Sequence, residues 1–220
     1  MDWQLVWDSL GPIALAGVLG TIPLSLASFA VGMVLALLLA LARMSPILPL
    51  SLASRFVISL VRGTPLLLQL FIVFYGLPLI GLKLEPWPSA ILALSINVGA
   101  YAAEVVRASI LSVPAGQWEA GYTVGMSRAL TLRRIIIPQA ARVSVPPLSN
   151  TFISLVKDTS LASLILVNEL FAEARKIAAF SQEFLVLYAT AGLVYWVICL
   201  VLSTAQVRLE KRLDRYVAHA

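Results

Sequence analysis

Long stretches without a charged residue constrain this chain more than any other feature. Asp, Glu, Lys and Arg are absent from Ser9 to Ala42, from Gly63 to Leu82, from Pro86 to Ala103 and from Phe184 to Val207. A helix needs roughly 20 apolar residues to cross the hydrocarbon core of a bilayer. Each of these runs is therefore long enough, or nearly long enough, to span a membrane.

A fifth run, Val143 to Asn168, reaches this length only if Lys157 and Asp158 lie within it. Apolar residues make up 60% of the chain and charged residues 12%, whereas soluble domains are nearer half apolar and a quarter charged. We therefore predict an all-α polytopic membrane protein with about five transmembrane helices in one domain, residues 1–220. The predicted spans are about residues 14–42, 64–82, 86–107, 143–165 and 184–207.

The basic residues gather at the ends of alternate apolar runs. With the N-terminus outside, the inner side receives Arg43, Arg55, Arg62, Arg107, Arg128, Arg133, Arg134, Arg142, Arg208, Lys211, Arg212 and Arg215. The basic residues left outside or within the bilayer are Lys83, Lys157, Arg175 and Lys176. Because cytoplasmic loops carry the excess of Lys and Arg, we predict an N-out, C-in topology. The net charge of +5 then reflects topology and not nucleic-acid binding.

Local signals agree with these helix boundaries. Thr64 is a candidate N-cap for a helix whose first residue is Pro65. Trp3, Trp7 and Trp87 are typical of interfacial anchors, since they flank the apolar runs.

Small residues recur every fourth position along the first run, at Ser28, Gly32, Ala36 and Ala40. Such a stripe lets two helix backbones approach closely in lipid. The alternative is chance in an alanine-rich segment.

The chain has few of the side chains that enzymatic catalysis or metal binding needs. The chain has one cysteine, Cys199, and one histidine, His219, so we expect neither a Ser-His-Asp triad nor a metal site. No lysine follows a glycine, so the chain lacks the phosphate-binding loop of nucleotide-hydrolysing proteins. The first ten residues carry Asp2 and Asp8 and no basic residue, unlike a secretory signal, so the first run should remain in the mature protein.

The segment between the third and fourth runs, about residues 113–142, is longer than most connections. Gln117 to Met126 predicts a short helix that a glycine ends. Arg133 to Arg142 predicts a second helix, which Pro138 should kink. An ordered, partly apolar hairpin on the inner face suits the docking of another protein, although packing against its own bundle is an equal alternative.

The hairpin resembles a known motif. Glu119-Ala120-Gly121, then Gly125, then Ile135-Ile136-Ile137-Pro138 resemble the EAA loop of bacterial ABC importer permeases, which reads E-A-A, three residues, G, nine residues, I-x-L-P. The spacing matches throughout. Gly121 replaces the second alanine and Ile137 replaces the leucine.

The resemblance covers nearly the whole chain. Arg62-Gly63-Thr64-Pro65-Leu66, Ala100-Tyr101-Ala102-Ala103-Glu104 and Leu155-Val156-Lys157-Asp158-Thr159-Ser160-Leu161 are similar to the polar amino-acid uptake family, and within it to cystine permeases. The resemblance implies a bacterial inner-membrane location and a second permease subunit, identical or similar to this one. It also implies two ATPase subunits, which use ATP and Mg, and an extracytoplasmic amino-acid-binding protein. This chain would bind no cofactor and would not be an enzyme.

The resemblance also assigns a role to residues 113–142, which we call the coupling hairpin. The helix from Glu119 to Gly125 would be the coupling helix that sits in a groove of the ATPase. The residues expected to couple to the ATPase are Glu119, Ala120, Gly121, Gly125, Met126, Ile135 and Pro138.

Charged side chains inside a span are costly and usually functional, which makes Glu104, Lys157 and Asp158 candidates for the substrate pathway. The alternative for Glu104 is pairing with Arg107 at i+3. For Lys157, the alternative is that its long side chain reaches the outer surface.

Polar neutral residues add further candidates. Asn97 and Tyr101 share one helix face with Glu104, and Asn150 shares a face with Ser154. Gln69 is a weaker candidate. A carboxylate suits the ammonium group of an amino acid, and hydroxyl and amide donors suit its carboxylate. The alternative for Asn97, Asn150 and Ser154 is hydrogen bonding between helices.

We therefore predict the permease subunit of an ATP-driven importer of a polar amino acid, with cystine as a candidate. The alternatives are a standalone secondary carrier or channel, and a membrane-embedded enzyme.

Overall fold

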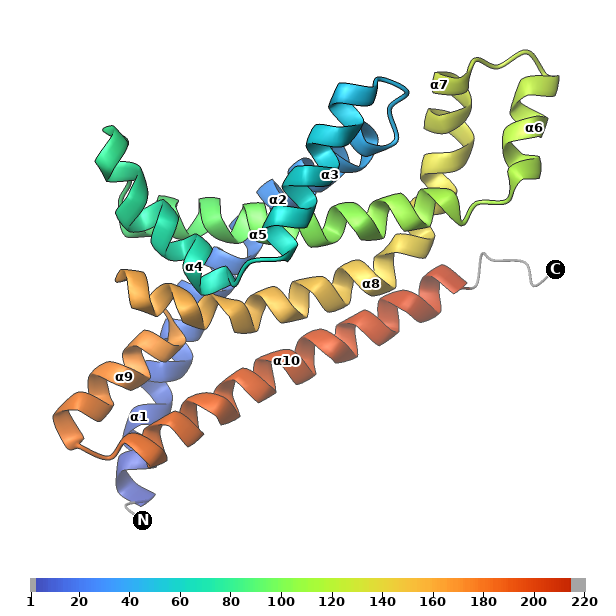
Figure 1. Cartoon of the computed structure of the whole chain (residues 1–220). Helices are drawn as coiled ribbons and strands as arrows, with labels where there is room; N and C mark the ends of the chain where they lie inside the picture. The colour runs from blue at the N-terminus through green and yellow to red at the C-terminus, as the bar shows by residue number, and fades with distance from the viewer. Residues whose placement is uncertain (1–2, 215–220) are drawn as a thin grey trace.

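In the computed structural model, residues 3–214 are described, and every regular element within them is helical (Figure 1). Arg215, predicted on the inner side, and His219 lie outside the described residues. The molecule is elongated (Figure 1). Its N-terminus lies at one end together with α1 and α9, and α6 and α7 lie at the other end, which we call the hairpin end.

Within the described part of the chain, three helices are long and apolar enough to cross a membrane. The first runs without a break from Trp3 to Arg43 and comprises α1 (Trp3–Ala16), a π-helical turn η1 (Gly17–Thr21) and α2 (Ile22–Arg43). The others are α5 (Pro86–Leu111) and α10 (Phe184–Asp214). They cover the first, third and last of the charge-free runs.

Two further helical segments are bent. The first joins α3 (Leu48–Arg62) at 104° to a segment made of α4 (Leu66–Phe71), η2 (Ile72–Gly76) and η3 (Leu77–Ile80). The second joins a long helical body at 50° to α9 (Leu170–Ser181). That body comprises α7 (Arg128–Thr131), η4 (Leu132–Ile136), α8 (Ile137–Asp158) and η5 (Thr159–Ile165). If each bent pair counts as one span, the described residues hold up to five spans.

The sequence did not reveal α3 or α9. Arg55 interrupts α3, and Glu173, Arg175 and Lys176 lie in α9, so neither helix stands out as a charge-free run. A rule that selects long apolar segments therefore places both helices in connecting loops.

The prediction that Thr64 caps the next helix is wrong. The N-cap of α4 is Pro65, and the helix begins at Leu66. The Thr64 hydroxyl donates instead to the carbonyl oxygen of Leu60 at 2.9 Å. Thr64 therefore satisfies a free carbonyl at the end of α3, where the bend leaves orphan acceptors.

The crossing of α2 and α5 organises the centre of the molecule. Ser28, Gly32, Ala36 and Ala40 are all buried in α2, which confirms the stripe of small residues. A Cβ atom on Gly32 would lie 2.3 Å from Cγ1 of Val98, and one on Gly99 would lie 3.0 Å from the carbonyl oxygen of Gly32. The two backbones thus touch through glycines that cannot be enlarged in place.

A second core, at the end opposite the hairpin, packs α1, α9 and α10 around Ile13, Leu170 and Leu187. Glu169 is fully buried beside it and acts as the N-cap of α9, accepting a 2.8 Å hydrogen bond from the amide of Ala172. Its other carboxylate oxygen accepts hydrogen bonds from Thr21 at 3.2 Å and from Tyr195 at 2.7 Å.

The tryptophans flanking the apolar runs differ in burial. Trp3 and Trp7 are 66% and 73% exposed. Trp87 instead packs against the core cluster that contains Leu24 and Leu94. Its indole therefore contributes to the packing of α5 as well as to the end of the span.

Candidate functional site

A pocket of about 490 Å³ opens where α4 begins, between α5 and α8. This size lies within the usual range of small-molecule sites, roughly 300–1,000 Å³. We call it the central pocket, and its lining residues are Thr64, Pro65, Leu66, Asn97, Val98, Tyr101, Asn150, Thr151, Ser154, Leu155, Asp158 and Leu161.

The central pocket brings together most of the polar residues that the sequence singled out. Asn97 and Tyr101 come from the middle of α5, and Asn150, Ser154 and Asp158 come from α8. Within each helix they are spaced by four residues, so one face of the helix presents them all. Residues from separate spans thus meet in one cavity.

Gln69 lies outside the lining and holds the lining in place. Its amide nitrogen donates to the carbonyl oxygen of Val61 at 2.7 Å and to Oγ1 of Thr64 at 2.9 Å. Its amide oxygen accepts from Nδ2 of Asn97 at 3.0 Å. Gln69 therefore ties the break between α3 and α4 to the pocket wall on α5.

A cation stands beside Tyr101. The guanidinium carbon of Arg62 lies 5.2 Å from the centre of the Tyr101 ring, within the range of a cation–π contact. The Tyr101 hydroxyl also donates to the carbonyl oxygen of Arg62 at 3.5 Å. Because Tyr101 lines the pocket, Arg62 adds positive charge close to its rim.

Asp158 supplies negative charge to the pocket wall. It is half-buried at the end of α8, and it forms no ion pair with another side chain within residues 3–212. The neighbouring Lys157 is exposed and lies outside the lining. The pocket thus presents a carboxylate together with amide and hydroxyl groups.

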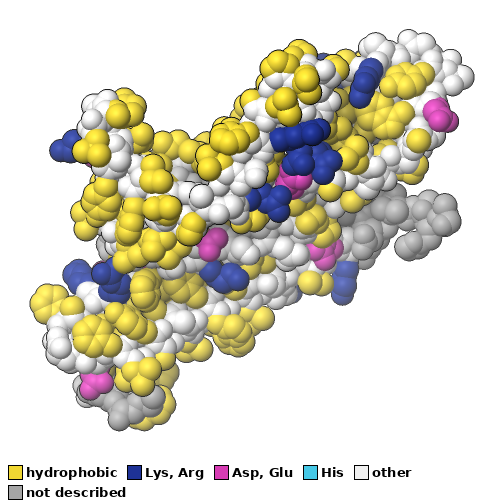
Figure 2. Space-filling model, viewed as in Figure 1, with side chains coloured by type: hydrophobic (Ala, Val, Ile, Leu, Met, Phe, Trp, Pro, Cys, Tyr) yellow, Lys and Arg dark blue, Asp and Glu magenta, His cyan; other side chains and the backbone are white. Residues whose placement is uncertain are grey.

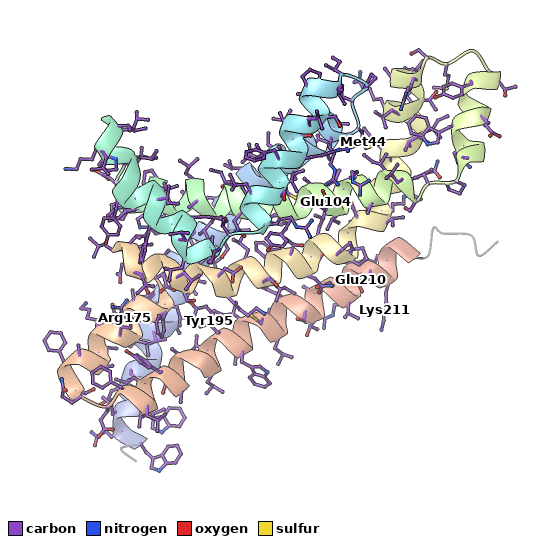
Figure 3. The ribbon with its side chains drawn as sticks, in the orientation of Figure 1. Met44, Glu104, Arg175, Tyr195, Glu210 and Lys211 are labelled. Carbon is purple, nitrogen blue, oxygen red and sulfur yellow. The ribbon has the colours of Figure 1, made fainter. Side chains whose placement is uncertain are left out.

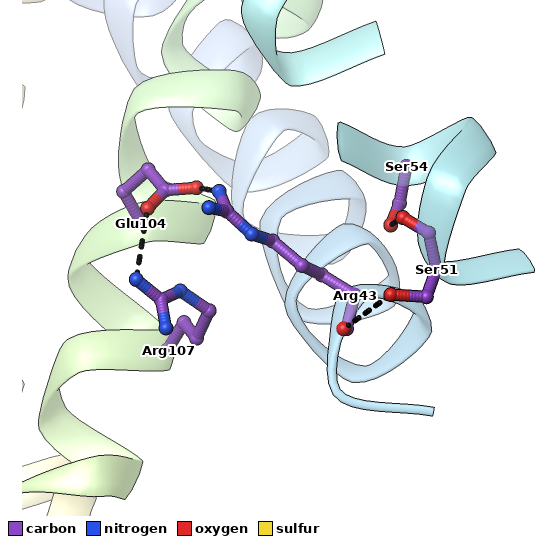
Figure 4. A network of polar contacts seen from close by, with 5 residues as sticks. All are labelled: Arg43, Ser51, Ser54, Glu104 and Arg107. Atoms are coloured by element: carbon purple, nitrogen blue, oxygen red, sulfur yellow. Dashed lines mark hydrogen bonds and ion pairs between the residues drawn. The ribbon is translucent and has the colours of Figure 1, made fainter. Parts of the chain in front are cut away.

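Glu104 lies outside the central pocket, in a cluster of charges (Figure 4). Arg43 of α2 pairs with one carboxylate oxygen, and Nη2 of Arg107 lies 3.5 Å from the other. The carbonyl oxygen of Arg43 accepts a 3.0 Å hydrogen bond from Ser51 of α3. This cluster joins α2, α3 and α5, and Figure 2 shows Lys and Arg side chains gathered in this region of a mainly apolar face.

Thr151 and Thr64 also line the pocket, although no sequence pattern predicted either of them as part of it. For Thr151, the signal was its spacing: it precedes Asp158 by seven residues and therefore lies on the same helix face. For Thr64, the signal was the adjacent Pro65 in a long apolar segment, because broken helices in membranes line cavities.

At the far end of the molecule, residues 113–142 contain α6 (Ala115–Thr123), α7, η4 and the first turns of α8 (Figure 1). The amide of Met126 donates to the carbonyl oxygen of Gly121 at 3.0 Å, and the amide of Gly125 donates to that of Tyr122 at 2.9 Å. With Gly125 at φ +78°, this pattern is a Schellman motif, in which glycine ends the helix. The predicted role of glycine as a helix terminator is confirmed.

The helix α6 packs against the end of α5 and against the start of the long helical body. Trp118 contacts the buried cluster that includes Ile110 and Ile136. Nε2 of Gln139, near the start of α8, donates to Oε1 of Gln117 at 3.2 Å. The helix α6 is thereby attached to the helical body that also carries part of the central pocket.

The residues expected to contact an ATPase differ in exposure. Glu119, Ala120 and Gly125 are exposed, Met126 and Ile135 are half-buried, and Gly121 is buried. Pro138 is exposed in the first turn of α8, directly after the π-helical turn η4. This wider turn accommodates the missing N–H of Pro138, and the helix continues past it.

The chain is similar in sequence to a family of transport proteins. The binding-protein-dependent transport system inner membrane component family matches residues 32–215. The chain belongs to this family. As a permease of this kind, it is a multi-pass protein of the bacterial inner membrane.

Two relatives with named substrates align with nearly the whole permease. The L-cystine transport system permease protein TcyB of Bacillus subtilis is 58% identical, with 99% of this chain and 94% of that protein covered. The glutamine transport system permease protein GlnP of Escherichia coli is 35% identical, with 96% of this chain and 97% of that protein covered.

A solved structure has the same fold. The crystal structure of an amino acid ABC transporter with histidines contains a chain of 34% identity and TM-score 0.86. The match covers 92% of the permease and 94% of that chain. These relatives are transport components, so the standalone carrier and the membrane-embedded enzyme are disfavoured.

Proposed function

We propose that this permease belongs to an ATP-driven importer of polar amino acids, with L-cystine as the first candidate substrate. The observation that carries the proposal is the 58% identity to the L-cystine permease over 99% of the chain. The glutamine permease, at 35%, is a more distant relative.

The central pocket supports an amino acid as the substrate. The ammonium group would face Asp158, since a carboxylate with no ion-pair partner among residues 3–212 attracts a cation. The carboxylate group would accept hydrogen bonds from Asn97, Asn150 or Ser154. Glu104 is a weaker candidate for the ammonium group than its place in the sequence suggested, because two guanidinium groups already surround it.

Coupling to ATP hydrolysis would enter through α6. The exposed Glu119 and Ala120 would contact an ATPase subunit, and closure of the ATPase pair would push the hairpin. Because α6 is attached to the body from Arg128 to Ile165, the push would displace Asn150, Ser154 and Asp158 relative to α5. Such a shift would open the pocket alternately to the two sides of the membrane.

The complex would contain two copies of an ATPase subunit, a second permease subunit and an extracytoplasmic amino-acid-binding protein. The charge distribution supports an N-out, C-in orientation. Lys211 near the end of α10 lies toward the hairpin end, whereas Arg175 lies toward the opposite end (Figure 3). A hairpin in the cytoplasm agrees with the positive-inside rule.

Reconstitution with candidate binding proteins tests this proposal. The permease and its ATPase are placed in liposomes, and ATP hydrolysis is measured with binding proteins loaded with different amino acids. We expect a cystine-loaded binding protein to give the largest stimulation. Stimulation by a sugar-loaded or peptide-loaded protein, and by no amino acid, would contradict the assignment.

A further inference from the structure

Gly121 faces Thr131 across the coupling hairpin at a distance that leaves no room for a side chain. A Cβ atom built on Gly121 would lie 2.5 Å from Cγ2, 2.7 Å from Oγ1 and 3.1 Å from Cβ of Thr131. Two of these separations are shorter than real Cβ contacts. The two helices therefore approach as closely as they do because residue 121 has no side chain.

Thr131 cannot move aside easily. It is fully buried, and its hydroxyl donates to the carbonyl oxygen of Ser127 at 3.1 Å. Rotation about its Cα–Cβ bond exchanges the positions of its branches and leaves its own Cβ atom in place. A larger residue at position 121 would therefore push α6 away from α7.

This contact lies between the two parts that coupling must connect. Gly121 is in α6 beside the exposed Glu119. Thr131 is in α7, at the start of the helical body that runs to Ile165 and carries Asp158 in the central pocket. The Trp118 packing and the Gln117–Gln139 hydrogen bond also attach α6 to this region.

We propose that Gly121 and Thr131 are a matched pair of positioning residues that transmits movement of α6 to the pocket wall on α8. The contact gives a physical reason for glycine at position 121, because a methyl group there would overlap the side chain of Thr131. The proposal rests on the proposed role of the hairpin in ATP coupling.

A set of matched variants tests the pair in the full complex of permease, ATPase and cystine-loaded binding protein. The variants are Gly121→Ala, Thr131→Ala and the double change, and the control is Gly116→Ala. Gly116 also lies in α6, but a Cβ atom added to it would meet no neighbouring atom of the described residues within 4 Å, so the same chemical change causes no clash there. The readouts are cystine taken up per ATP hydrolysed and the amount of ATPase that co-purifies.

We expect Gly121→Ala to lower uptake per ATP about tenfold, as overpacking displaces α6. Thr131→Ala alone removes side-chain atoms between the two helices and causes no clash. We expect it to lower uptake per ATP about threefold. The double variant should recover most of the coupling, since only the 3.1 Å approach to Cβ of residue 131 remains. Gly116→Ala should match the unaltered protein, and all variants should retain the ATPase.

Three results would overturn the pair: Gly121→Ala behaving like Gly116→Ala, the double variant being as impaired as Gly121→Ala, or Thr131→Ala leaving uptake per ATP unchanged. If Gly121→Ala does not fold, the Thr131→Ala result alone still tests whether the pair transmits the movement of α6. Failure of the unaltered complex to show any ATP-driven uptake would instead refute the proposed function, so the two failures are distinct.

Discussion

Tyr195 of α10 donates a 2.7 Å hydrogen bond to Glu169, the buried N-cap of α9. The same carboxylate binds Thr21 in the π-helical turn of the first long helix. A Cβ atom on Gly20 would lie 2.7 Å from the carbonyl oxygen of Asn168. The absence of a side chain at Gly20 therefore lets the backbone next to Glu169 pack closely against the first long helix. One acidic side chain thus joins three helices.

Replacing Glu169 should destabilise the protein. In Glu169→Ala, the donor groups of Thr21, Tyr195 and Ala172 lose their acceptor, which should lower the free energy of unfolding by about 2 kcal/mol. Thermal unfolding of the purified protein in detergent measures this effect. The control is Glu173→Ala in the same helix, whose only ion pair within residues 3–212 is a 3.6 Å contact with the exposed Lys176. Equal melting temperatures for the two variants would contradict the structural role.

The glycine contact between α2 and α5 gives a second prediction. Gly32→Ala should destabilise the protein by about 1–3 kcal/mol, because the new methyl group would overlap Val98. Val98→Ala in the same chain should restore part of this loss. Gly192→Ala is the control, since no atom of the described residues lies within 4 Å of its added Cβ. Thermal unfolding that ranks Gly32→Ala with the control would show that the helices do not cross here.

Asp158 should determine the affinity for substrate. Asp158→Asn keeps the shape of the side chain and removes the charge, so the ammonium group loses its partner. We expect uptake at low substrate concentration to fall at least about tenfold, while the ATPase still co-purifies. Glu173→Gln removes a carboxylate of α9 outside the pocket lining and should have little effect. Uptake by Asp158→Asn at the level of this control would remove Asp158 from the substrate pathway.

Glu104 should behave differently from Asp158. Its carboxylate and the two arginines are 20–30% exposed, so their pairing should contribute about 1 kcal/mol to stability. Glu104→Gln should therefore lower the melting temperature and leave the substrate concentration for half-maximal uptake nearly unchanged. A large change in that concentration, with an unchanged melting temperature, would return Glu104 to the substrate pathway.

Glu119 is exposed on α6, where it is available to a partner. Glu119→Lys reverses its charge, and we expect it to abolish ATP-driven uptake while the permease remains inserted in the membrane. Membrane fractionation checks insertion, and co-purification of the ATPase shows whether docking is lost. Normal uptake by this variant would contradict the role assigned to the coupling hairpin.

Much of the fold could be predicted from the sequence because lipid imposes a simple rule on composition. Charge-free runs located α2, α5 and α10, and the glycine at position 125 marked the end of α6. The same rule concealed α3 and α9, because charged residues lie inside both helices. Glu169 was missed because a single acid in a presumed loop gives no periodic signal, and only the fold reveals that it is buried.

The site was partly predictable for a related reason. Spacing within one helix showed that Asn97 accompanies Tyr101 and that Asn150 accompanies Ser154. It could not show that these two faces meet, because that depends on how α5 and α8 pack. Nor could it show that Arg43 reaches Glu104 from another helix and occupies its carboxylate.

The central claim is that this permease moves its substrate only when a separate ATPase drives it. Uptake of labelled cystine into liposomes tests this most directly, with the permease, the ATPase and the binding protein present together or omitted singly. We predict accumulation only when all three and ATP are present. Accumulation by the permease alone, without ATP, would contradict the account.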